Sequence, residues 1–533
     1  MSPTRRQFLL QVSATGVTAL AARKLPASTL ATQMTMPMGA AAPKVPMLHS
    51  LELTPFVDEL PLPQKAVASS GKSGQHIRIT MREIHVKVHR DVPPTRMWSY
   101  GDTALAPLIE ARSNQPLRVE WINHLPTKHF LPVDFSLHGC GHDVPEVRAC
   151  VHMHGGKNPS SEDGYPEDWY VPGKSRVQNY PFQQDATALW YHDHAMGLNR
   201  LNVYAGLVGM CLVRDAVEET LQLPTGKYEL PLTLYDRNFT RDGQLLYLDS
   251  GDPEHPWVPE FYGDAILING KIRPFVHVEP RVYRLRLLNA ANSRFFALSF
   301  SEGVTGHQIG SDQGLLAAPV PMHQLNLAPA ERADILVDFS QSAGKTVHLK
   351  NAALEVLQFR VAAKAEAGTS FALPKTLRPM ERTPVTSATV TRQITLNEYV
   401  DKIGNSMLML LNRKHWHEPV TETPKLNSTE IWEFLNLTED THPMHLHLVR
   451  FQVLDRQLFD VFAYRNDKGM HPIREPLQPE PNEMGWKDVV QCPPGMITRI
   501  IVRFEGYPGK YLYHCHVLEH EANDMMRPFE VIA

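Results

Sequence analysis

The stretch LRVEWIN at residues 117–123 alternates apolar and polar side chains and ends in asparagine. The same pattern returns as YRLRLLN at 283–289 and as EIWEFLN at 430–436. Alternation with a period of two is typical of a β-strand that has one face on a core and the other in water. Three copies of one strand, roughly 150 residues apart, predict a chain of three similar β-domains.

A second pattern, a turn containing proline that leads into another strand, also occurs three times. It reads VPG at 171–173, APA at 328–330 and PPG at 493–495. At nearly the same distance after each turn, a histidine lies in a β-rich run. These histidines are His192, His348 and His514. Both patterns therefore divide the chain into the same three repeats.

The repeats predict an all-β fold, because units of this size that alternate in polarity fold as one β-sandwich or β-barrel each. We expect domains over residues 48–220, 221–370 and 380–533. A linker rich in Ala, Lys, Pro and Thr near residues 362–387 marks the second boundary.

Composition and charge restrict the kinds of molecule that this protein can bind. Lys and Arg total 53 against 57 Asp and Glu, a formal net charge of -4, and no basic run occurs beyond the N-terminus. The sequence therefore predicts no nucleic-acid partner. Hydrophobic residues make up 43% of the chain, enough for a large core. Histidine is unusually frequent, with 26 copies.

The N-terminus has the features of a targeting signal. TRRQFLL at residues 4–10 precedes a short stretch of small and apolar residues, and this arrangement resembles a twin-arginine export signal. An Arg-rich transit peptide or a surface helix is the alternative. We expect residues 1–47 to be signal and linker, and the protein to be exported by the Tat machinery to the periplasm or outside the cell. No segment is apolar for the length of a membrane-spanning helix.

Eight histidines form four His-x-His pairs. In a strand, residues i and i+2 project to the same face, so each pair delivers two imidazoles to one side. Eight imidazoles exceed what one four- or five-coordinate ion needs, and several metal ions are expected together. The pairs are His152 with His154, His192 with His194, His445 with His447, and His514 with His516.

Cys515 identifies the metal. Its side chain points to the opposite face from those of His514 and His516, so it serves a different site. One thiolate, imidazoles and a weak thioether form the ligand set of a blue-copper centre, which His520 and Met525 complete together with His442. The sequence therefore predicts a mononuclear copper site. Four other histidines, His138, His142, His415 and His417, are expected to be ordinary surface or core residues.

These motifs resemble those of the multicopper oxidases, in particular the branch of bacterial spore-coat laccases and bilirubin oxidases. The similarity extends over nearly the whole chain after the leader and includes LNVYAGLVG at 201–209, WHEPVTETP at 416–424 and GWKD at 485–488. It implies three cupredoxin-like Greek-key domains and four copper ions: one type 1, one type 2 and a binuclear type 3 pair. The predicted export signal argues against a spore-coat location.

The resemblance also implies a ligand set for each copper, carried over position by position. Type 1 copper takes His442, Cys515, His520 and Met525. Type 2 copper takes His152 and His445. One type 3 copper takes His154, His192 and His516, and its partner takes His194, His447 and His514. Asp163 and Glu521 align with acidic residues that the family places near the three-copper cluster, where a carboxylate can relay protons; for these two, plain surface charge is the alternative.

The remaining cysteines leave the disulfide question open. Cys140, Cys150, Cys211 and Cys492 allow three complete pairings. In an oxidising compartment Cys140 and Cys150 can close a local loop, and they are equally compatible with free thiols. Cys211 lies in an apolar strand and is expected to be a buried thiol.

The function that the resemblance implies is a laccase-like oxidase. A small phenolic, aminophenolic or bilirubin-like substrate gives up electrons near His520, Cys515 conducts them to His514 and His516, and O2 is reduced to water. We expect a monomer. A cuprous, ferrous or manganese oxidase in metal tolerance is the main alternative, although the Met-rich insertion typical of that class is not found. The four histidine pairs argue against a two-domain nitrite reductase, and the complete ligand set argues against a non-catalytic relative.

Overall fold

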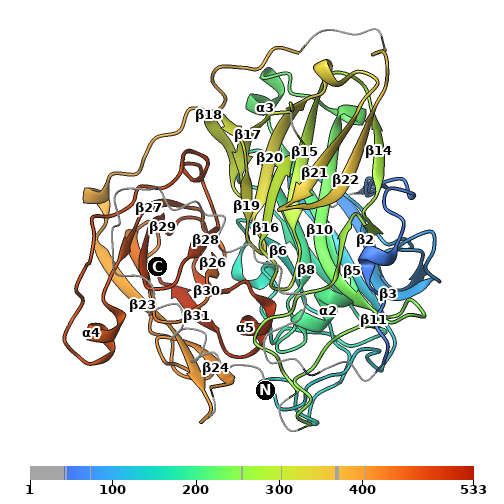
Figure 1. Cartoon of the computed structure of the whole chain (residues 1–533). Helices are drawn as coiled ribbons and strands as arrows, with labels where there is room; N and C mark the ends of the chain where they lie inside the picture. Colours follow the sequence, from blue (N-terminus) through green and yellow to red (C-terminus); the bar gives the residue numbers. More distant parts are fainter. Residues whose placement is uncertain are drawn as a thin grey trace, which may run out of the picture. The chain divides into compact units, whose positions relative to one another are not determined.

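A computed structural model describes residues 41–533, except 42–44, 72–73, 254–255, 302, 367–370 and 403. The chain divides into two units, residues 1–33 and 34–533, and the description below concerns the second unit. The predicted export signal, with Arg5 and Arg6, lies outside the described residues. The described part consists mostly of strands with short helices (Figure 1), which confirms the predicted all-β fold class.

The three repeated strands occupy equivalent places in three sheets. They are β5 (Leu117–His124), β15 (Val282–Asn289) and β25 (Thr429–Asn436). Each pairs in parallel with a strand that precedes it in the chain, and antiparallel with the strand that follows one of the three proline turns. The two sequence patterns thus come from one repeated three-strand arrangement.

The asparagine that ends each repeated strand explains why the two patterns recur together. Its side-chain oxygen accepts the backbone N–H two residues on, and its side-chain nitrogen donates to the carbonyl just before the proline turn. In the first repeat these bonds run from Leu125 to Asn123 (3.0 Å) and from Asn123 to Tyr170 (3.1 Å). Asn289 and Asn436 make the same pair of bonds, to the carbonyls of Leu327 and Cys492. We call this arrangement the asparagine joint.

The first third of the chain forms two sheets. One contains β1 (Ser69–Gly71), β2 (Gly74–Val86), β3 (Thr95–Tyr100), β5 and β7 (Ser175–Tyr180). The other contains β4 (Ile109–Arg112), β9 (Val208–Arg214), β8 (Thr187–Asp193) and β6 (Val151–His154). Two short helices follow β8 and β9, α2 (Asn199–Ala205) and α3 (Ala216–Thr220).

The middle third also forms two sheets. The larger contains β13 (Lys271–Ile272), β12 (Ala265–Ile268), β10 (Glu229–Phe239), β11 (Leu245–Leu246), β15, β20 (Arg332–Asp338), β17 (Gly306–Ser311) and β18 (Gly314–Met322). The smaller contains β14 (Phe275–Val278), β22 (Leu354–Val361), β21 (Thr346–Asn351), β16 (Phe296–Phe300) and β19 (Leu325–Leu327).

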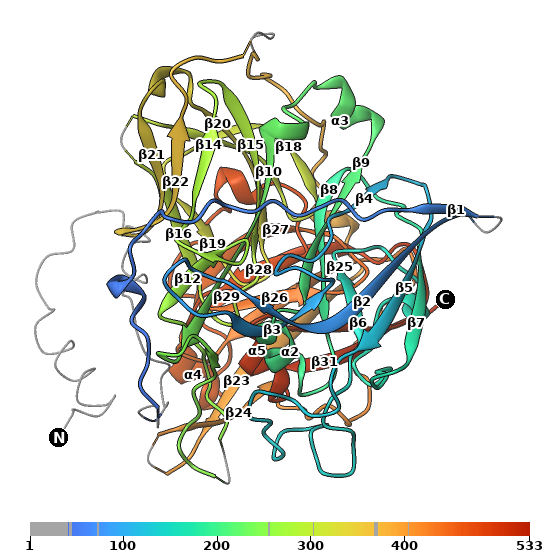
Figure 2. The ribbon, with the colours of Figure 1, turned by 90° about the vertical axis from the view of Figure 1, so that its right-hand side faces the viewer.

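The last third repeats this plan. One sheet contains β24 (Ser406–Leu411), β23 (Val390–Val400), β25, β29 (Met496–Arg503) and β27 (Phe451–Leu458). The other contains β28 (Val489–Cys492), β26 (His442–Leu446), β30 (Gly509–Cys515) and β31 (Met526–Val531). Two short helices complete this part, α4 (Val461–Arg465) and α5 (Leu518–Ala522). In Figure 2, α5 lies beside α2 of the first third, and Asn199 of α2 donates to Glu521 of α5 at 2.6 Å.

Each third contributes a hydrophobic core, and the first core also includes side chains of the other two thirds, such as Phe261 and Leu518. Trp121 and Trp190 lie in the first core, Leu232 and Leu285 in the second, and Trp432 in the third, all fully buried. Each third thus has a pair of sheets, while the division into three β-domains with boundaries at residues 220, 370 and 380 stays a prediction. No helix in the described ranges has the length and hydropathy needed to cross a membrane.

Candidate metal centres

Cys515, His442 and His520 converge at one point in the core of the last third. The Cys515 sulfur lies 3.5 Å from His442 Nδ1 and 3.6 Å from His520 Nδ1, and the two Nδ1 atoms lie 3.2 Å apart. Met525 is fully buried in the same core, and its carbonyl accepts the Cys515 backbone N–H at 3.0 Å. Strands β26 and β30 and helix α5 thus bring the predicted sulfur and imidazoles together.

Thr438 fixes the orientation of His442. Its hydroxyl lies 2.6 Å from His442 Nε2, the ring nitrogen that faces away from the sulfur. The hydroxyl and backbone N–H of Thr438 both donate to Asn436, which belongs to the third asparagine joint. The joint therefore holds the hydroxyl that in turn holds the imidazole, with Nδ1 left to face Cys515.

The eight paired histidines meet where β6 and β8 lie beside β26 and β30 (Figure 1). Within each strand pair, His152 is in register with His192, and His445 is in register with His514. Across the two pairs, the His154 and His445 rings stack with centroids 3.7 Å apart. The four pairs therefore line one shared space.

Three subsets of these histidines have nitrogens that all lie within 4.8 Å of one another. The subset of His194, His447 and His514 is identical to one predicted type 3 ligand set. The other two subsets combine histidines that were predicted to bind different copper ions. His516 joins the group through its ring, whose centroid lies 5.0 Å from that of His154 and 5.3 Å from that of His192. The subsets are His194 with His447 and His514, His152 with His154 and His192, and His152 with His445 and His447.

The cluster has the donor chemistry that copper requires. Buried polar atoms normally have hydrogen-bond partners, yet within the described chain the Nε2 atoms of His152, His192 and His445 and both ring nitrogens of His516 have none. Burial lowers the pKa of seven of the eight imidazoles well below the usual value, which leaves them neutral with lone pairs available. These seven are His152, His154, His192, His194, His445, His447 and His516.

The opposite ring nitrogens are held by acceptors, as metal-binding imidazoles require. Nδ1 of His152 contacts the Asp163 carbonyl at 2.6 Å, and Nδ1 of His445 contacts the Asp488 carbonyl at 2.8 Å. These contacts fix the tautomer and point Nε2 inward. The residues present fit a group of copper ions.

Asp163 and Glu521 both lie at the cluster. The Asp163 carboxylate contacts His447 Nδ1 at 2.7 Å, and Glu521 lies 3.2 Å from His514 Nδ1 and 3.4 Å from His194 Nδ1. Burial raises the pKa of Asp163 well above its usual value, because the charged carboxylate is removed from water. The surface-charge alternative is wrong for both residues, because both are buried.

Sequence reasoning missed Asp488 and Arg332. The Asp488 carboxylate lies 3.2 Å from His154 Nε2 and 3.8 Å from His445 Nδ1. Arg332, from the middle third, forms a two-point ion pair with it, one contact being 2.7 Å from Nη1 to Oδ1. Asp488 lies in the GWKD run at 485–488 that the sequence analysis noted without assigning it a role. The middle third, which holds no predicted ligand, thus supports the cluster through a buried ion pair.

His520 is covered in this structure. The imidazole has no exposed surface, and its Nε2 lies 3.6 Å from Oε1 of Glu260, a residue of the middle third. The expected docking of substrate near His520 stays a prediction.

None of the five cysteines, all within the described ranges, forms a disulfide. The Cys140 sulfur lies 4.0 Å from the Met196 carbonyl, and the Cys150 thiol donates to the Tyr165 carbonyl at 3.1 Å. The local loop that a Cys140–Cys150 bridge would close is thus held by separate contacts. Cys211 is buried, as expected for a strand thiol.

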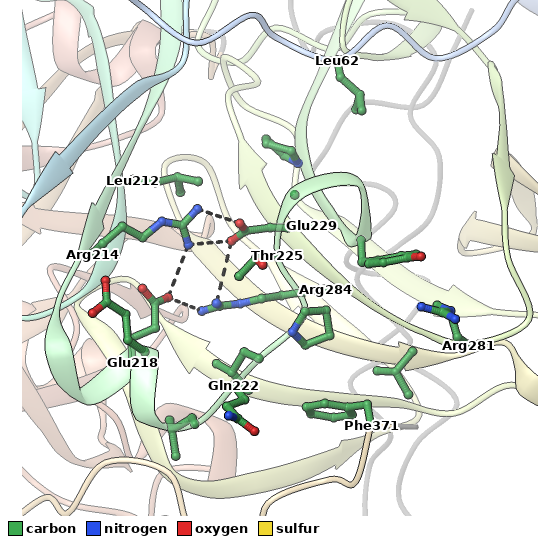
Figure 3. Close-up of a pocket in the computed structure, with 18 of the residues that line it drawn as sticks. Leu62, Leu212, Arg214, Glu218, Gln222, Thr225, Glu229, Arg281, Arg284 and Phe371 are labelled. Carbon is green, nitrogen blue, oxygen red and sulfur yellow. Dashed lines mark hydrogen bonds and ion pairs between the residues drawn. The ribbon is translucent and has the colours of Figure 1, made fainter. Parts of the chain in front are cut away.

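A cavity of about 1640 Å³ near the junction of the first and middle thirds contains none of the predicted site residues (Figure 3). Its wall is an ion-pair network in which Arg214 and Arg284 contact Glu218 and Glu229. Burial opposes ionisation of Glu229, but the neighbouring arginines hold its pKa below the usual value. The opposite charges of this network are paired with one another. The network therefore holds the first and middle thirds together.

Comparisons with known proteins agree with this geometry. A family model described as multicopper oxidase matches residues 80–218, and a second with the same description matches residues 380–533. The chain is 43% identical over 510 residues to a laccase of Bacillus stratosphericus, covering 90% of this chain and 100% of that protein. It is 38% identical over 503 residues to multicopper oxidase LPR2 of Arabidopsis thaliana, covering 84% of this chain and 86% of that protein.

Solved structures show the same architecture. A laccase from Pediococcus acidilactici superposes with a TM-score of 0.75 at 26% identity, covering 94% of this chain and 100% of that one. The multicopper oxidase McoA from Aquifex aeolicus superposes with a TM-score of 0.73 at 27% identity, covering 90% of this chain and 100% of that one. The likeness therefore includes the middle third, between the two stretches that the family models match.

Proposed function

The chain belongs to the multicopper oxidase family, and on that premise we propose that it oxidises phenolic, aminophenolic or bilirubin-like substrates and reduces O2 to water. The observation that carries the proposal is the position of Cys515. Its sulfur faces His442 and His520, while its neighbours His514 and His516 belong to the histidine cluster. One short covalent segment therefore joins the site of electron entry to the site of oxygen reduction.

We assign four copper ions to the two centres. Bound copper supplies the one-electron chemistry: it accepts electrons singly and delivers them to oxygen. Type 1 copper is assigned to His442, Cys515, His520 and Met525, and type 2 copper to His152 and His445. The type 3 pair is assigned to His154, His192 and His516, and to His194, His447 and His514.

The electron path is short. Consecutive residues lie about 3.8 Å apart at Cα, so the backbone from Cys515 to either neighbouring histidine is a single peptide unit. His514 Nδ1 also donates to the Cys515 carbonyl at 3.1 Å, which adds a second contact along the same route. The chain thus provides two connections between the sulfur and one imidazole of the cluster.

Protons reach the cluster through its two buried acids. Asp163 contacts His447 from one side, and Glu521 contacts His194 and His514 from another. Asn199 donates to Glu521 at 2.6 Å and keeps its carboxylate directed at the histidines. We assign both acids to proton delivery during oxygen reduction.

The segment before the fold is assigned to export. The twin-arginine pattern at residues 5–6 supports transport of the folded, copper-loaded enzyme to the periplasm or beyond. We propose that the exported enzyme is a monomer and that its partners are O2, a small reductant and the Tat export machinery.

Metal analysis combined with oxygen uptake tests the proposal. The copper-loaded enzyme should contain about four copper ions per chain, following the family assignment, and should consume O2 with a phenol or bilirubin. Cu(I), Fe(II) and Mn(II) serve as comparison reductants. Zinc in place of copper, clearly fewer than four coppers, or uptake with metal ions alone would contradict it, and the last result would support the metal-oxidase alternative.

Replacing Thr438 by valine should change the type 1 copper without removing it. The substitution keeps the shape of the side chain but deletes the hydroxyl that holds His442 Nε2. We expect a shifted reduction potential and a displaced blue absorption band, with copper content unchanged. Thr438→Ser keeps the hydroxyl and is the matched control, which should resemble the wild type. If the spectra of the valine variant coincide with those of the wild type, Thr438 does not influence the type 1 copper.

A further inference from the structure

A second group of histidines lies outside the two copper centres. His138 of the first third and His415 of the last third contact the carboxylate of Asp524, and His417 of the last third contacts His138. His138 Nε2 lies 2.8 Å from His417 Nε2, although the two residues are far apart in sequence. All three histidines were predicted to be ordinary surface or core residues, and the structure brings them together.

Asp524 sets the tautomers in this group. Its Oδ1 accepts from His138 Nδ1 at 2.9 Å, and its Oδ2 accepts from His415 Nδ1 at 2.8 Å. A carboxylate only accepts hydrogen bonds, so the His138 proton is on Nδ1 and the lone pair is on Nε2. That lone pair points at His417. This arrangement of carboxylate, imidazole and open nitrogen is the one that orients histidines in metal sites.

The backbone that carries His415 and His417 is held in place. The buried Arg527 guanidinium donates to the carbonyls of His415, Trp416, Glu418 and Pro419. Trp416 packs into the interior between the two histidines, and His417 is exposed to solvent. The loop is therefore anchored while the His417 imidazole stays accessible to an ion and free to adjust.

We propose that His138 and His417 bind one divalent cation of the class that prefers imidazole, such as Zn²⁺, through their Nε2 atoms. Asp524 is a positioning residue there. The proton that His417 Nε2 shares with His138 Nε2 is replaced, by exchange with solvent, by a proton on His417 Nδ1, so that the imidazole stays neutral. The cation then lies between the two Nε2 atoms, and water completes the coordination. The carboxylate offsets part of the charge.

The required movement is small. Zn–N bonds of about 2.0–2.1 Å at a tetrahedral ion place two ligand nitrogens about 3.3 Å apart. The observed 2.8 Å separation must therefore open slightly, which the exposed His417 side chain can provide. Because His138 and His417 come from different thirds of the chain, a bound cation would tie the first third to the last.

The site shares no residue with the copper assignments of the proposed function, although Asp524 directly precedes Met525. A chain that fails the oxidase test can still bind zinc here, and an active oxidase can lack this site. The two proposals therefore fail separately.

Equilibrium dialysis of the copper-loaded full chain against Zn²⁺, with copper measured in the same samples, tests the proposal. We expect the wild type to bind one zinc per chain with copper content unchanged, and the midpoint of thermal unfolding to rise with zinc. His417→Ala and His138→Gln should each weaken zinc binding at least tenfold and abolish that rise. His142→Ala removes an exposed histidine of the same loop, which stacks on Phe135, and should behave like the wild type.

Two results would contradict the proposed zinc site. In one, the copper-loaded wild type takes up no zinc at millimolar concentration. In the other, His417→Ala and His138→Gln retain wild-type affinity, which would place the zinc elsewhere. His417 is exposed, so its variant should fold, and circular dichroism verifies this before dialysis.

Discussion

Replacing Cys515 by serine should abolish the blue colour and lower the rate of substrate oxidation by at least about a thousandfold, which corresponds to about 4 kcal/mol of barrier. The sulfur is the only predicted type 1 ligand that also begins the covalent path to His514 and His516. A serine hydroxyl is nearly the same size, but it is a poor ligand for this kind of copper site. Absorption and paramagnetic resonance spectra, together with oxygen uptake, measure the effect.

The three-copper ligands should remain loaded in the same variant, because no cluster histidine is changed. Cys211→Ala is the matched control: it removes a buried thiol from strand β9, away from the predicted ligands, and should leave colour and rate unchanged. A blue and active Cys515→Ser protein would refute the assignment of the type 1 site.

Replacing Arg332 by methionine should have the largest effect on stability. The guanidinium is fully buried and forms a two-point ion pair with Asp488. Removing one partner of a buried pair leaves an uncompensated charge, which costs about 3–5 kcal/mol of the free energy of unfolding. Urea denaturation measures this loss. Copper content should fall as well, because Asp488 would no longer be held against His154 and His445.

An exposed ion pair is the control for Arg332. Arg78 lies 2.9 Å from Glu120, and its side chain is 65% exposed, so Arg78→Met should cost at most about 1 kcal/mol. If the two variants unfold at the same urea concentration and retain the same copper, the buried pair does not support the cluster.

The fold could be predicted because its signals are local. The alternating strands at 117–123, 283–289 and 430–436 show their period within seven residues, and the structure finds all three in equivalent places. The His-x-His pairs are equally local, since a strand alone puts residues i and i+2 on one face. Convergence of Cys515, His442 and His520 followed from ligand chemistry.

The supporting contacts could not be predicted because they depend on tertiary structure. Arg332 and Asp488 are separated by 156 residues, and charged residues are usually exposed, so the sequence gives no reason to bury this pair. The covering of His520 by Glu260 likewise depends on how two thirds of the chain pack. His138 and His417 lie far apart in sequence, and only the packed fold shows that their nitrogens meet.

The asparagine joint has a consequence for how the enzyme matures. It recurs in the middle third, where no copper ligand is assigned, and it consists of amide groups and backbone alone. The polypeptide can therefore complete its architecture while still empty of metal, unlike a zinc finger, whose ion is needed for folding. Copper would then enter sites whose ligands the fold has already brought together.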